Sequence, residues 1–525
     1  MRGVQLRGAV RRTLPAVAAV LLAVGSGGCR LTAGDGDDGR PVSVGTTDTV
    51  STLDPAGAYD AGSWALYGNV YQSLLTFGPG SATPVPDAAR RCGFRGDDLR
   101  TYTCELRPGL RFANGHALTA KDVKFSFDRI VRIKSPQGPG SLLETLRSVE
   151  ASADGTTVTF RLKVPDATFP LKIATGAGSV VDSRLYPADR LRRGNEADGS
   201  GPYVLKDYQP GASAGLERNE HYTGAVKKVG ADVTVRYFAD PDRMSQAWKR
   251  RSVEVAARQM PPADVAGLSS SDSAVRVHEN AAANTRFLVF NLREGSPVQP
   301  PAVRRAMAAV IDRQAIARDV HLRTVEPLYS LIPQGLTGHA TSFFDAYPKP
   351  DPERARQLLQ KAGVAVPVDF GLAYSQGAVT EQEAALLKKQ LEATGLFRVT
   401  TRKVAWQEFQ EGYARGAYDA YCVSWVADFP DPDTFTSPLV GAGNAFHSGY
   451  SSSRVEELIR ATQQNPRRGL VADEIRSIQK IVAEDVPMVP LWQKKDYVLS
   501  TAAISGTQYL SDGTGIWRLW MLGRI

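Results

Sequence analysis

Residues 417–433 read Ala-Tyr-Asp-Ala-Tyr-Cys-Val-Ser-Trp-Val-Ala-Asp-Phe-Pro-Asp-Pro-Asp. The run Tyr418–Ser424 is apolar and aromatic, which is typical of a buried strand. Two prolines follow it and cannot continue a strand or a helix interior. Asp428 therefore stands just past the end of a core strand, where a carboxylate is well placed to hold a cationic group.

Strand and helix patterns alternate on both sides of this stretch. Period-two alternation predicts strands over Thr156–Lys163 and Asp232–Phe238. Helical spacing of apolar residues predicts a helix after Thr119, with Asp122 as its capping-box partner. Further helices are predicted from Pro301, over Asp351–Gly363 and over Val471–Val482. Helices alternating with strands indicate the α/β class.

The N-terminus has the pattern of a secretory signal peptide. Arg2, Arg7, Arg11 and Arg12 precede the first acid, and an apolar run, Leu14–Val24, leads to small residues. As a helix that run rises only about 16 Å, too short for a bilayer core of about 30 Å. We therefore predict a signal peptide over residues 1–28.

Cys29 follows the small residues and resembles the cysteine of a bacterial lipobox, although Ser26 stands where a Leu or Val is usual. The resemblance implies a diacylated thiol, and two acyl chains suffice for stable anchoring to the cell membrane. Residues 29–40 are rich in Gly and Asp and predict a flexible tether. Without processing, the protein would be released or cleaved elsewhere.

The net charge of the chain is +8 and its pI is about 9.2, which raises the hypothesis of nucleic-acid binding. No cluster of basic residues with interleaved aromatics supports it. Cleavage before Cys29 removes four arginines and no acids, so the charge falls from +8 to +4. Half of the basic excess belongs to targeting, and no nucleic-acid partner is expected.

Cys92 and Cys104 flank the turn-forming run Gly93–Arg100, and in an extracytoplasmic protein such a pair predicts a disulfide across a hairpin. Two buried free thiols are the alternative. Cys422 lies in the apolar strand and is expected to be a buried thiol.

Motifs of metal and nucleotide enzymes are missing from the sequence, and no cofactor and no metal are expected. One catalytic pattern matches: residues 211–215 form a G-x-S-x-G string around Ser213. A nucleophile elbow needs a strand before the serine and a helix after it. Leu216–Glu220 instead indicates a returning strand, so a hairpin turn is predicted and a serine hydrolase is a remote alternative.

Six blocks over roughly residues 42–495 carry a family resemblance. They are Thr52-Leu-Asp-Pro-Ala56, Leu118-Thr-Ala-Lys-Asp-Val-Lys-Phe-Ser-Phe127, Gly199-Ser-Gly-Pro-Tyr-Val-Leu-Lys206, Val303-Arg-Arg-Ala306, Trp425-Val-Ala-Asp-Phe-Pro-Asp-Pro-Asp433 and Val486-Pro-Met-Val-Pro-Leu491. In their order and spacing they resemble the family 5 extracellular solute-binding proteins, the oligopeptide- and dipeptide-binding subunits of ABC importers.

The resemblance implies an α/β, two-lobed periplasmic-binding-protein-like fold of the large peptide-binding type, with an extra subdomain in lobe one. The implied segments are 41–290 for lobe one with an insertion near 74–197, 291–492 for lobe two, and 493–525 as a return to lobe one. Hinge crossings are expected near Asn291 and Leu491. Closure of two lobes around a ligand is a known switching motion.

The resemblance also implies site residues. Asp428 matches the acid that accepts the α-amine of a peptide in relatives, with Trp425 and Ala427 beside it and Trp406 as an aromatic wall. Lobe one contributes a loop of four residues, Tyr59, Asp60, Ser63 and Trp64.

Alternatives remain for several of these residues. Asp428 can be a local cap, a tryptophan can belong to the core, and Asp428, Asp431 and Asp433 can form a calcium site. Some oligopeptide binders have an arginine where this chain has Cys422, so their grip on a ligand carboxylate is not carried over.

The expected function is that of an extracytoplasmic lipoprotein, at the cell surface or in the periplasm. It captures a small solute, with a short peptide favoured, and delivers it to an ABC permease and its ATPase as a monomer without performing chemistry. Alternative ligands are a nickel complex, a sugar or a modified peptide. A peptide-sensing lipoprotein is the alternative from another functional class.

Overall fold

The computed structural model describes residues 39–268, 273–511, 514 and 516–525. The predicted signal peptide, Cys29 and most of the predicted tether lie outside the described residues. None of the described helices is both long and apolar enough to span a membrane.

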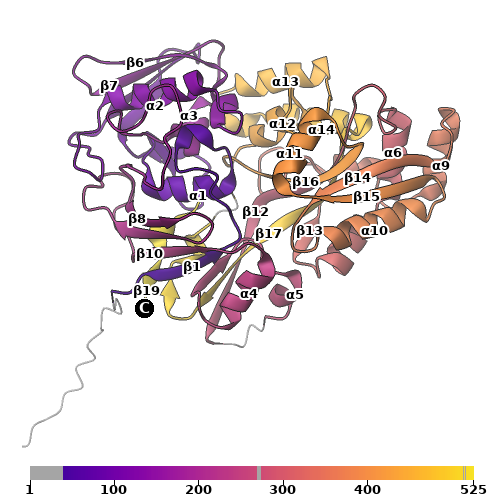
Figure 1. Ribbon diagram of the computed structural model, residues 1–525. Coiled ribbons are helices and arrows are strands. Elements are labelled where there is room, and N and C mark those ends of the chain that lie inside the picture. Colours follow the sequence, from indigo (N-terminus) through magenta and orange to yellow (C-terminus); the bar gives the residue numbers. More distant parts are fainter. Residues whose placement is uncertain (1–38, 269–272, 512–513, 515) are drawn as a thin grey trace, which may run out of the picture. The chain divides into compact units, whose positions relative to one another are not determined.

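One large mixed sheet organises the described chain (Figure 1). Its strands are β1 (Val42–Thr46), β8 (Tyr203–Gln209), β9 (Ser213–Arg218), β10 (Val233–Tyr237), β11 (Val255–Ala257), β12 (Val275–Phe290), β13 (Val325–Pro327), β14 (Val368–Ser375), β15 (Phe397–Val404), β16 (Ala420–Val426) and β17 (Met488–Thr501). Among the described residues their order is β15-β14-β16-β12-β17-β11-β1-β10-β9-β8, with β13 paired to β17.

The two long strands β12 and β17 connect the two ends of this sheet. Residues 284–290 of β12 pair with β16, whereas residues 498–500 of β17 pair with β11. The pairing of β12 with β17 shifts register between Ala281 and Thr285, between these two regions. Buried apolar side chains form separate cores at the two ends, one around β14, β15 and β16 and the other around β1, β8 and β10.

Helices pack against the large sheet and against a smaller sheet described below. They are α1 (Ala61–Val70), α2 (Ala120–Ile133), α3 (Phe169–Lys172), α4 (Pro241–Lys249), α5 (Pro262–Ala266), α6 (Pro301–Val310), α7 (Arg313–Ala315), α8 (Ser342–Ala346), α9 (Pro352–Lys361), α10 (Thr380–Glu392), α11 (Trp406–Arg415), α12 (Asp433–Val440), α13 (Ser453–Gln463) and α14 (Ala472–Asp485). Figure 1 shows α10 and α11 on opposite sides of β14 and β15. This follows from right-handed crossovers, because the chain moves outward from β14 to β15 and then back to β16.

A smaller sheet belongs to the segment where the sequence predicts an insertion. It contains β4 (Ala89–Phe94), β5 (Thr101–Leu106), β6 (Leu146–Ala151) and β7 (Thr157–Leu162). Cys92 and Cys104 face each other across β4 and β5, and a disulfide joins them. Short strand pairs complete the described structure: β2 (Leu75–Phe77) with β3 (Pro84–Pro86), and β18 (Ile504–Ser505) with β19 (Gly523–Arg524).

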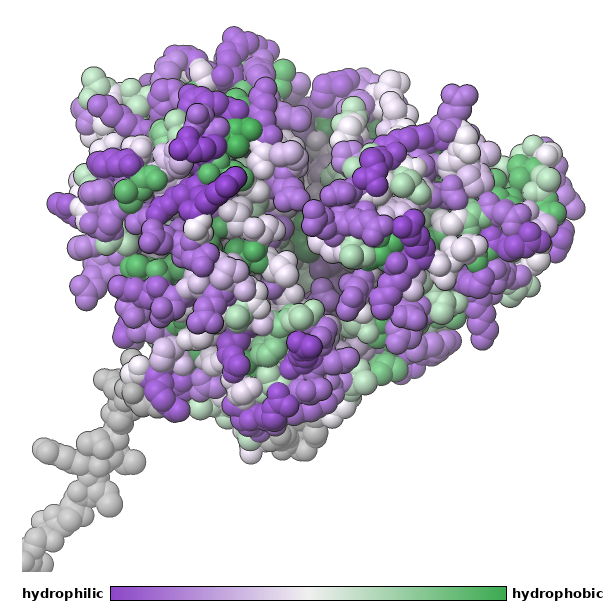
Figure 2. Space-filling view, viewed as in Figure 1, coloured by the Kyte–Doolittle hydropathy of each residue, from purple (hydrophilic) through white to green (hydrophobic). Residues whose placement is uncertain are grey.

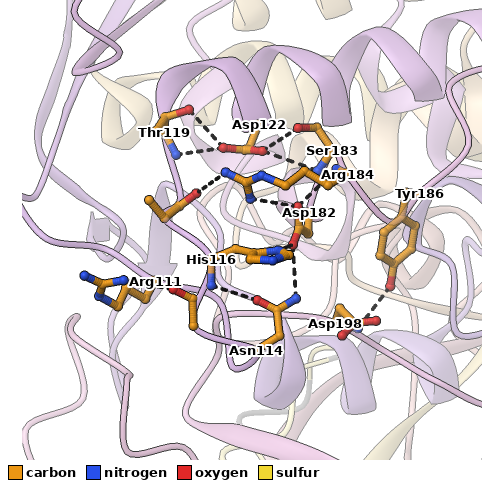
Figure 3. A network of polar contacts seen from close by, with 12 residues as sticks. Arg111, Asn114, His116, Thr119, Asp122, Asp182, Ser183, Arg184, Tyr186 and Asp198 are labelled. Carbon is orange, nitrogen blue, oxygen red and sulfur yellow. Dashed lines mark hydrogen bonds and ion pairs between the residues drawn. The ribbon is translucent and has the colours of Figure 1, made fainter.

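The start of α2 is fixed by a network of polar contacts (Figure 3). Asp122 Oδ2 accepts from Thr119 N at 2.8 Å and Oγ1 at 2.9 Å, so the predicted capping box is confirmed. The other carboxylate oxygen accepts from Ser183 Oγ at 2.7 Å. Next to it, His116 Nδ1 lies 2.6 Å from Asp182 Oδ2. The network ties the helix start to residues 182–184 of the same insertion.

The G-x-S-x-G string lies in the hairpin between β8 and β9. Gly211 has a φ of +70°, which suits the turn, and Ser213 is the first residue of β9. A strand follows the serine, so the strand–turn–helix geometry of a nucleophile elbow is absent at this position, as predicted.

Candidate functional site

Tyr59 and Asp428, which are 369 residues apart, meet in the structure. The Tyr59 hydroxyl donates a hydrogen bond of 2.6 Å to Asp428 Oδ2. Tyr59 precedes α1 beside the β1 end of the sheet, and Asp428 follows β16 at the other end. Figure 2 shows the surface hollowed between these two parts of the molecule. The contact therefore joins residues that the sequence assigns to different lobes.

The Asp428 carboxylate is buried and has no cationic partner among the described residues. Its exposed fraction is 6%. Oδ2 also accepts from Thr434 Oγ1 at 3.2 Å, while no hydrogen bond from the described chain reaches Oδ1. Burial raises the pKa of Asp428 to about 7, and the nearby charge of Asp433 also raises it. The hydrogen bonds from Tyr59 and Thr434 lower this pKa, but they do not offset burial. A nearby cation would stabilise the ionised form of such a buried carboxylate.

Trp425 and Ala427 fix the end of β16. The Trp425 indole N–H donates to the Thr434 carbonyl at 2.7 Å, and its ring meets Phe446 edge-on at 5.7 Å between centroids. Ala427 N donates to the Ala283 carbonyl at 2.8 Å. These bonds hold Asp428 in position at the register shift of the long strands.

The residues around Tyr59 hold it in place. Asp60 caps α1, accepting from Ser63 N at 2.7 Å and Oγ at 2.9 Å. Trp64 is buried, donates to the Ala58 carbonyl at 3.1 Å and stacks on Tyr59 with ring centroids 5.2 Å apart. Burial raises the pKa of Asp60 despite these bonds. Trp64 thus contacts Tyr59 directly, whereas Asp60 and Ser63 fix the start of the helix that follows Tyr59.

Trp406 lies on the surface at the first position of α11. Its exposed fraction is 52%, and its ring contacts Phe409 at 6.0 Å between centroids. The alternative that Trp406 is a core residue is therefore wrong. None of the described contacts connects this side chain with Asp428.

Asp431 and Asp433 belong to a separate ionic cluster. The Arg468 guanidinium binds Asp431 with bonds of 2.9 and 2.7 Å. Asp433 accepts a hydrogen bond of 3.1 Å from Gln463 Nε2. Burial raises the pKa of Asp433 to about 6, although the charge of Lys172 lowers it. Within the described residues no three His, Cys, Asp or Glu side chains gather closely enough to hold a metal ion. The calcium alternative has no support here.

Thr434 was not predicted from the sequence, although it follows the Asp-Pro-Asp turn directly and the first turn of α12 brings its hydroxyl back to Asp428. Thr285 and Asn284 were also missed. Thr285 Oγ1 and Asn284 Oδ1 are buried without a hydrogen-bond partner at the register shift. Only the sheet order places them there, so no local signal in the sequence reveals them.

The described fold and the contact between its two parts define a two-lobed binding protein. The chain belongs to the bacterial extracellular solute-binding proteins of family 5, whose model matches residues 83–447. The predicted family and the two-lobed α/β fold are thereby confirmed. Members of this family are extracellular solute-binding proteins, in agreement with the predicted class.

Relatives with solute-binding names match this chain over most of their length. Di/tripeptide-binding protein 2 of Pseudomonas aeruginosa is 28% identical over 80% of this chain and 83% of its own. The probable D,D-dipeptide-binding periplasmic protein DdpA of Escherichia coli is 25% identical over 88% of this chain and 90% of its own. The periplasmic binding protein DppA of Helicobacter pylori, solved with the peptide STSA, superposes with a TM-score of 0.80 at 20% identity, covering 92% of this chain and 98% of its own.

Proposed function

We propose that this protein captures a short peptide between its lobes, accepts the free α-amine of that peptide with Asp428, and delivers it to an ABC permease with its ATPase. The observation that carries this proposal is the buried Asp428 carboxylate, which has one oxygen without a hydrogen bond and no cationic partner in the described chain. An α-ammonium supplies the missing charge and up to three donors. Two relatives support the choice, because one is a di/tripeptide-binding protein and the other a probable D,D-dipeptide-binding protein.

Lobe closure makes this site. In the proposed division, 41–290 with 493–525 form lobe one and 291–492 forms lobe two, and the register shift between Ala281 and Thr285 lies beside the crossing. In this division Tyr59 reaches Asp428 from the opposite lobe. We therefore expect their hydrogen bond to form only when the lobes close. A bound ammonium and this hydrogen bond then stabilise closure together.

The rest of the proposal concerns the location of the protein in the cell. A signal peptide over residues 1–28 exports the chain, and lipidation of Cys29 anchors it to the membrane beside its permease. Mass spectrometry of the protein from a membrane fraction is the measurement, with a diacylglyceryl adduct on Cys29 as the expected result. A soluble protein cleaved at another residue would contradict the anchor without affecting the binding proposal.

Thermal unfolding in the presence of peptides tests the binding function. A peptide at 100 times its Kd stabilises the folded protein by about 2.7 kcal/mol. We expect short peptides with a free amine to raise Tm and their N-acetylated copies, which lack the charge, to do so much less. A screen in which no peptide raises Tm, or in which both forms act equally, would overturn the proposal.

The affinity for a free-amine peptide should depend on pH. The pKa of Asp428 is about 7 because of burial, so below pH 7 the acid must lose a proton before it can accept an ammonium. We expect the affinity to fall roughly tenfold per pH unit below 7. It should fall again above about 8, where the α-amine itself loses its proton. Isothermal titration calorimetry between pH 5 and 9 measures both limbs, and a flat profile would contradict the assignment.

A further inference from the structure

The insertion contacts the other end of the molecule at a place separate from the Tyr59–Asp428 bond. Ala167, just before α3, donates its backbone N–H to the carbonyl of Gln463, the last residue of α13, with 2.6 Å between N and O. Figure 1 shows α3 on the side of the insertion that faces α12 and α13. In the proposed division Ala167 belongs to lobe one and Gln463 to lobe two. The insertion, which contains none of the predicted ligand-binding residues, therefore takes part in the contact between the lobes.

Phe429 adds apolar packing to this contact. It directly follows Asp428 and is 1% exposed. The other buried members of its hydrophobic cluster come from residues 56–180 and from Ile516, which the proposed division assigns to lobe one. Separation of the lobes would move this aromatic side chain out of that cluster and expose it to water, which is unfavourable.

A buried ion pair lies in the insertion next to Ala167. Lys172 Nζ, at the end of α3, donates to Asp166 Oδ2 at 2.8 Å. Asp166 is 1% exposed and Lys172 is 7% exposed. Burial lowers the pKa of Lys172, but the charges of Asp166 and Asp433 outweigh burial and raise it. Lys172 is thus a buried cation of lobe one that is stabilised by an acid of lobe two.

Asp433 has no cation of its own lobe in bonding contact among the described residues. The guanidinium of Arg468 forms its two side-chain bonds with Asp431, and the side-chain donor to Asp433 is the neutral amide of Gln463. Burial raises the pKa of Asp433, and the charge of Lys172 is the largest of the effects that lower it. The charge of this buried acid is therefore balanced mainly from the insertion, across the boundary between the lobes.

We propose that the insertion acts as a clasp, in which residues 166–172 hold Phe429, Asp433 and Gln463 of lobe two and slow the opening of the closed form. The proposal rests on the function proposed above, because it takes closure around a ligand as given. Lys172 and Asp433 are then positioning residues, which need not touch the ligand. A ligand enclosed between lobes leaves only when they open, so the clasp acts on the dissociation rate.

A double-mutant cycle in the dissociation rate tests the clasp. A free-amine peptide that raises Tm carries a fluorescent label near its C-terminus, and stopped-flow displacement by unlabelled peptide gives the rate. We expect Lys172→Gln and Asp433→Asn each to raise this rate roughly threefold to tenfold. The double variant should dissociate about as fast as either single variant, because all three lose the same contact. A residue that only stabilises its own lobe would not produce this coupling.

The choice of variants separates the clasp from damage to the fold. Asp433→Asn keeps an oxygen for the amide of Gln463 and removes only the charge. It therefore decides alone if Lys172→Gln, which leaves Asp166 without its cation, does not fold. The control is Asp369→Asn, because Asp369 pairs with Arg398 inside lobe two at 2.9 Å, and this variant should leave the rate unchanged.

Two results overturn the clasp alone: a dissociation rate that Asp433→Asn leaves unchanged, and single effects that multiply in the double variant. A wild-type protein that binds no peptide overturns the proposed function, and the clasp with it.

Discussion

Replacing Asp428 by alanine is expected to weaken the binding of a free-amine peptide by about 2–5 kcal/mol, roughly 30-fold to a few thousand-fold in Kd. The reason is that the ammonium of the peptide would then be buried without its counter-charge. Among the described residues, Tyr59 forms its side-chain hydrogen bond with Asp428 and with no other acid. Calorimetry at pH 7.5 with one peptide and both proteins gives the ratio directly. The N-acetylated peptide, which has no charge to lose, should bind the two proteins alike.

Two controls separate this effect from damage to the fold. Asp431→Asn removes a neighbouring buried acid whose partner is Arg468, and it should leave the preference for the free amine in place. Asp428→Asn should lose the preference while its folded state gains stability at high pH. The folded pKa of Asp428 lies near 7, above the ordinary value of about 3.9. Its ionisation therefore costs stability, a cost that is absent below pH 4 and complete above pH 7.

Unchanged affinity in Asp428→Ala would show that the carboxylate is a cap for the turn before α12, the alternative that its bond with Thr434 supports. The melting curve of the ligand-free variant then becomes informative. A cap role predicts a loss of stability at every pH, whereas a ligand role predicts no loss at pH 8.

Local physical chemistry explains why some elements could be predicted from the sequence. The side chain of Asp351 accepts from Arg354 N at the start of α9, and Gly363 follows its end, both as the pattern predicts. The turn at Gly211 and the returning strand follow from glycine and from period-two alternation. In each case the deciding atoms lie within a few residues of one another, so one segment contains the whole cause.

The site could be predicted only in part, because its atoms come from distant segments. The family resemblance assigned Tyr59 and Asp428 to the same cleft, but their hydrogen bond depends on the order in which β12 and β17 join the sheet. The same order sets the ends of β1 and β11 side by side. Trp406 lies at an exposed helix start, and its place in the pocket wall stays a prediction.

A second large effect, on the stability of the fold, is expected from a buried ion pair. The pair fixes the block Thr52–Ala56, which leads to Tyr59. Arg129 on α2 donates to Asp54 Oδ1 at 2.9 Å and Oδ2 at 2.7 Å, and both residues are 1% exposed. Asp54 also accepts from Ala56 N at 3.0 Å and Arg192 N at 2.7 Å. Arg129→Met leaves this carboxylate buried without its cation, so we expect the free energy of unfolding to fall by about 3–5 kcal/mol.

Urea denaturation of the ligand-free protein measures this loss, and α2 offers its own control. Arg132 lies one turn further on, is exposed, and donates to the Ala188 carbonyl at 3.1 Å. Arg132→Met should change stability by less than about 0.5 kcal/mol. Adding Asp54→Asn to Arg129→Met removes the orphaned charge and should restore part of the loss. If Arg129→Met costs no more than Arg132→Met, the pair does not stabilise the loop. Tyr59 must then be positioned by Asp60 and Trp64 alone, through the cap of α1 and the stacked rings.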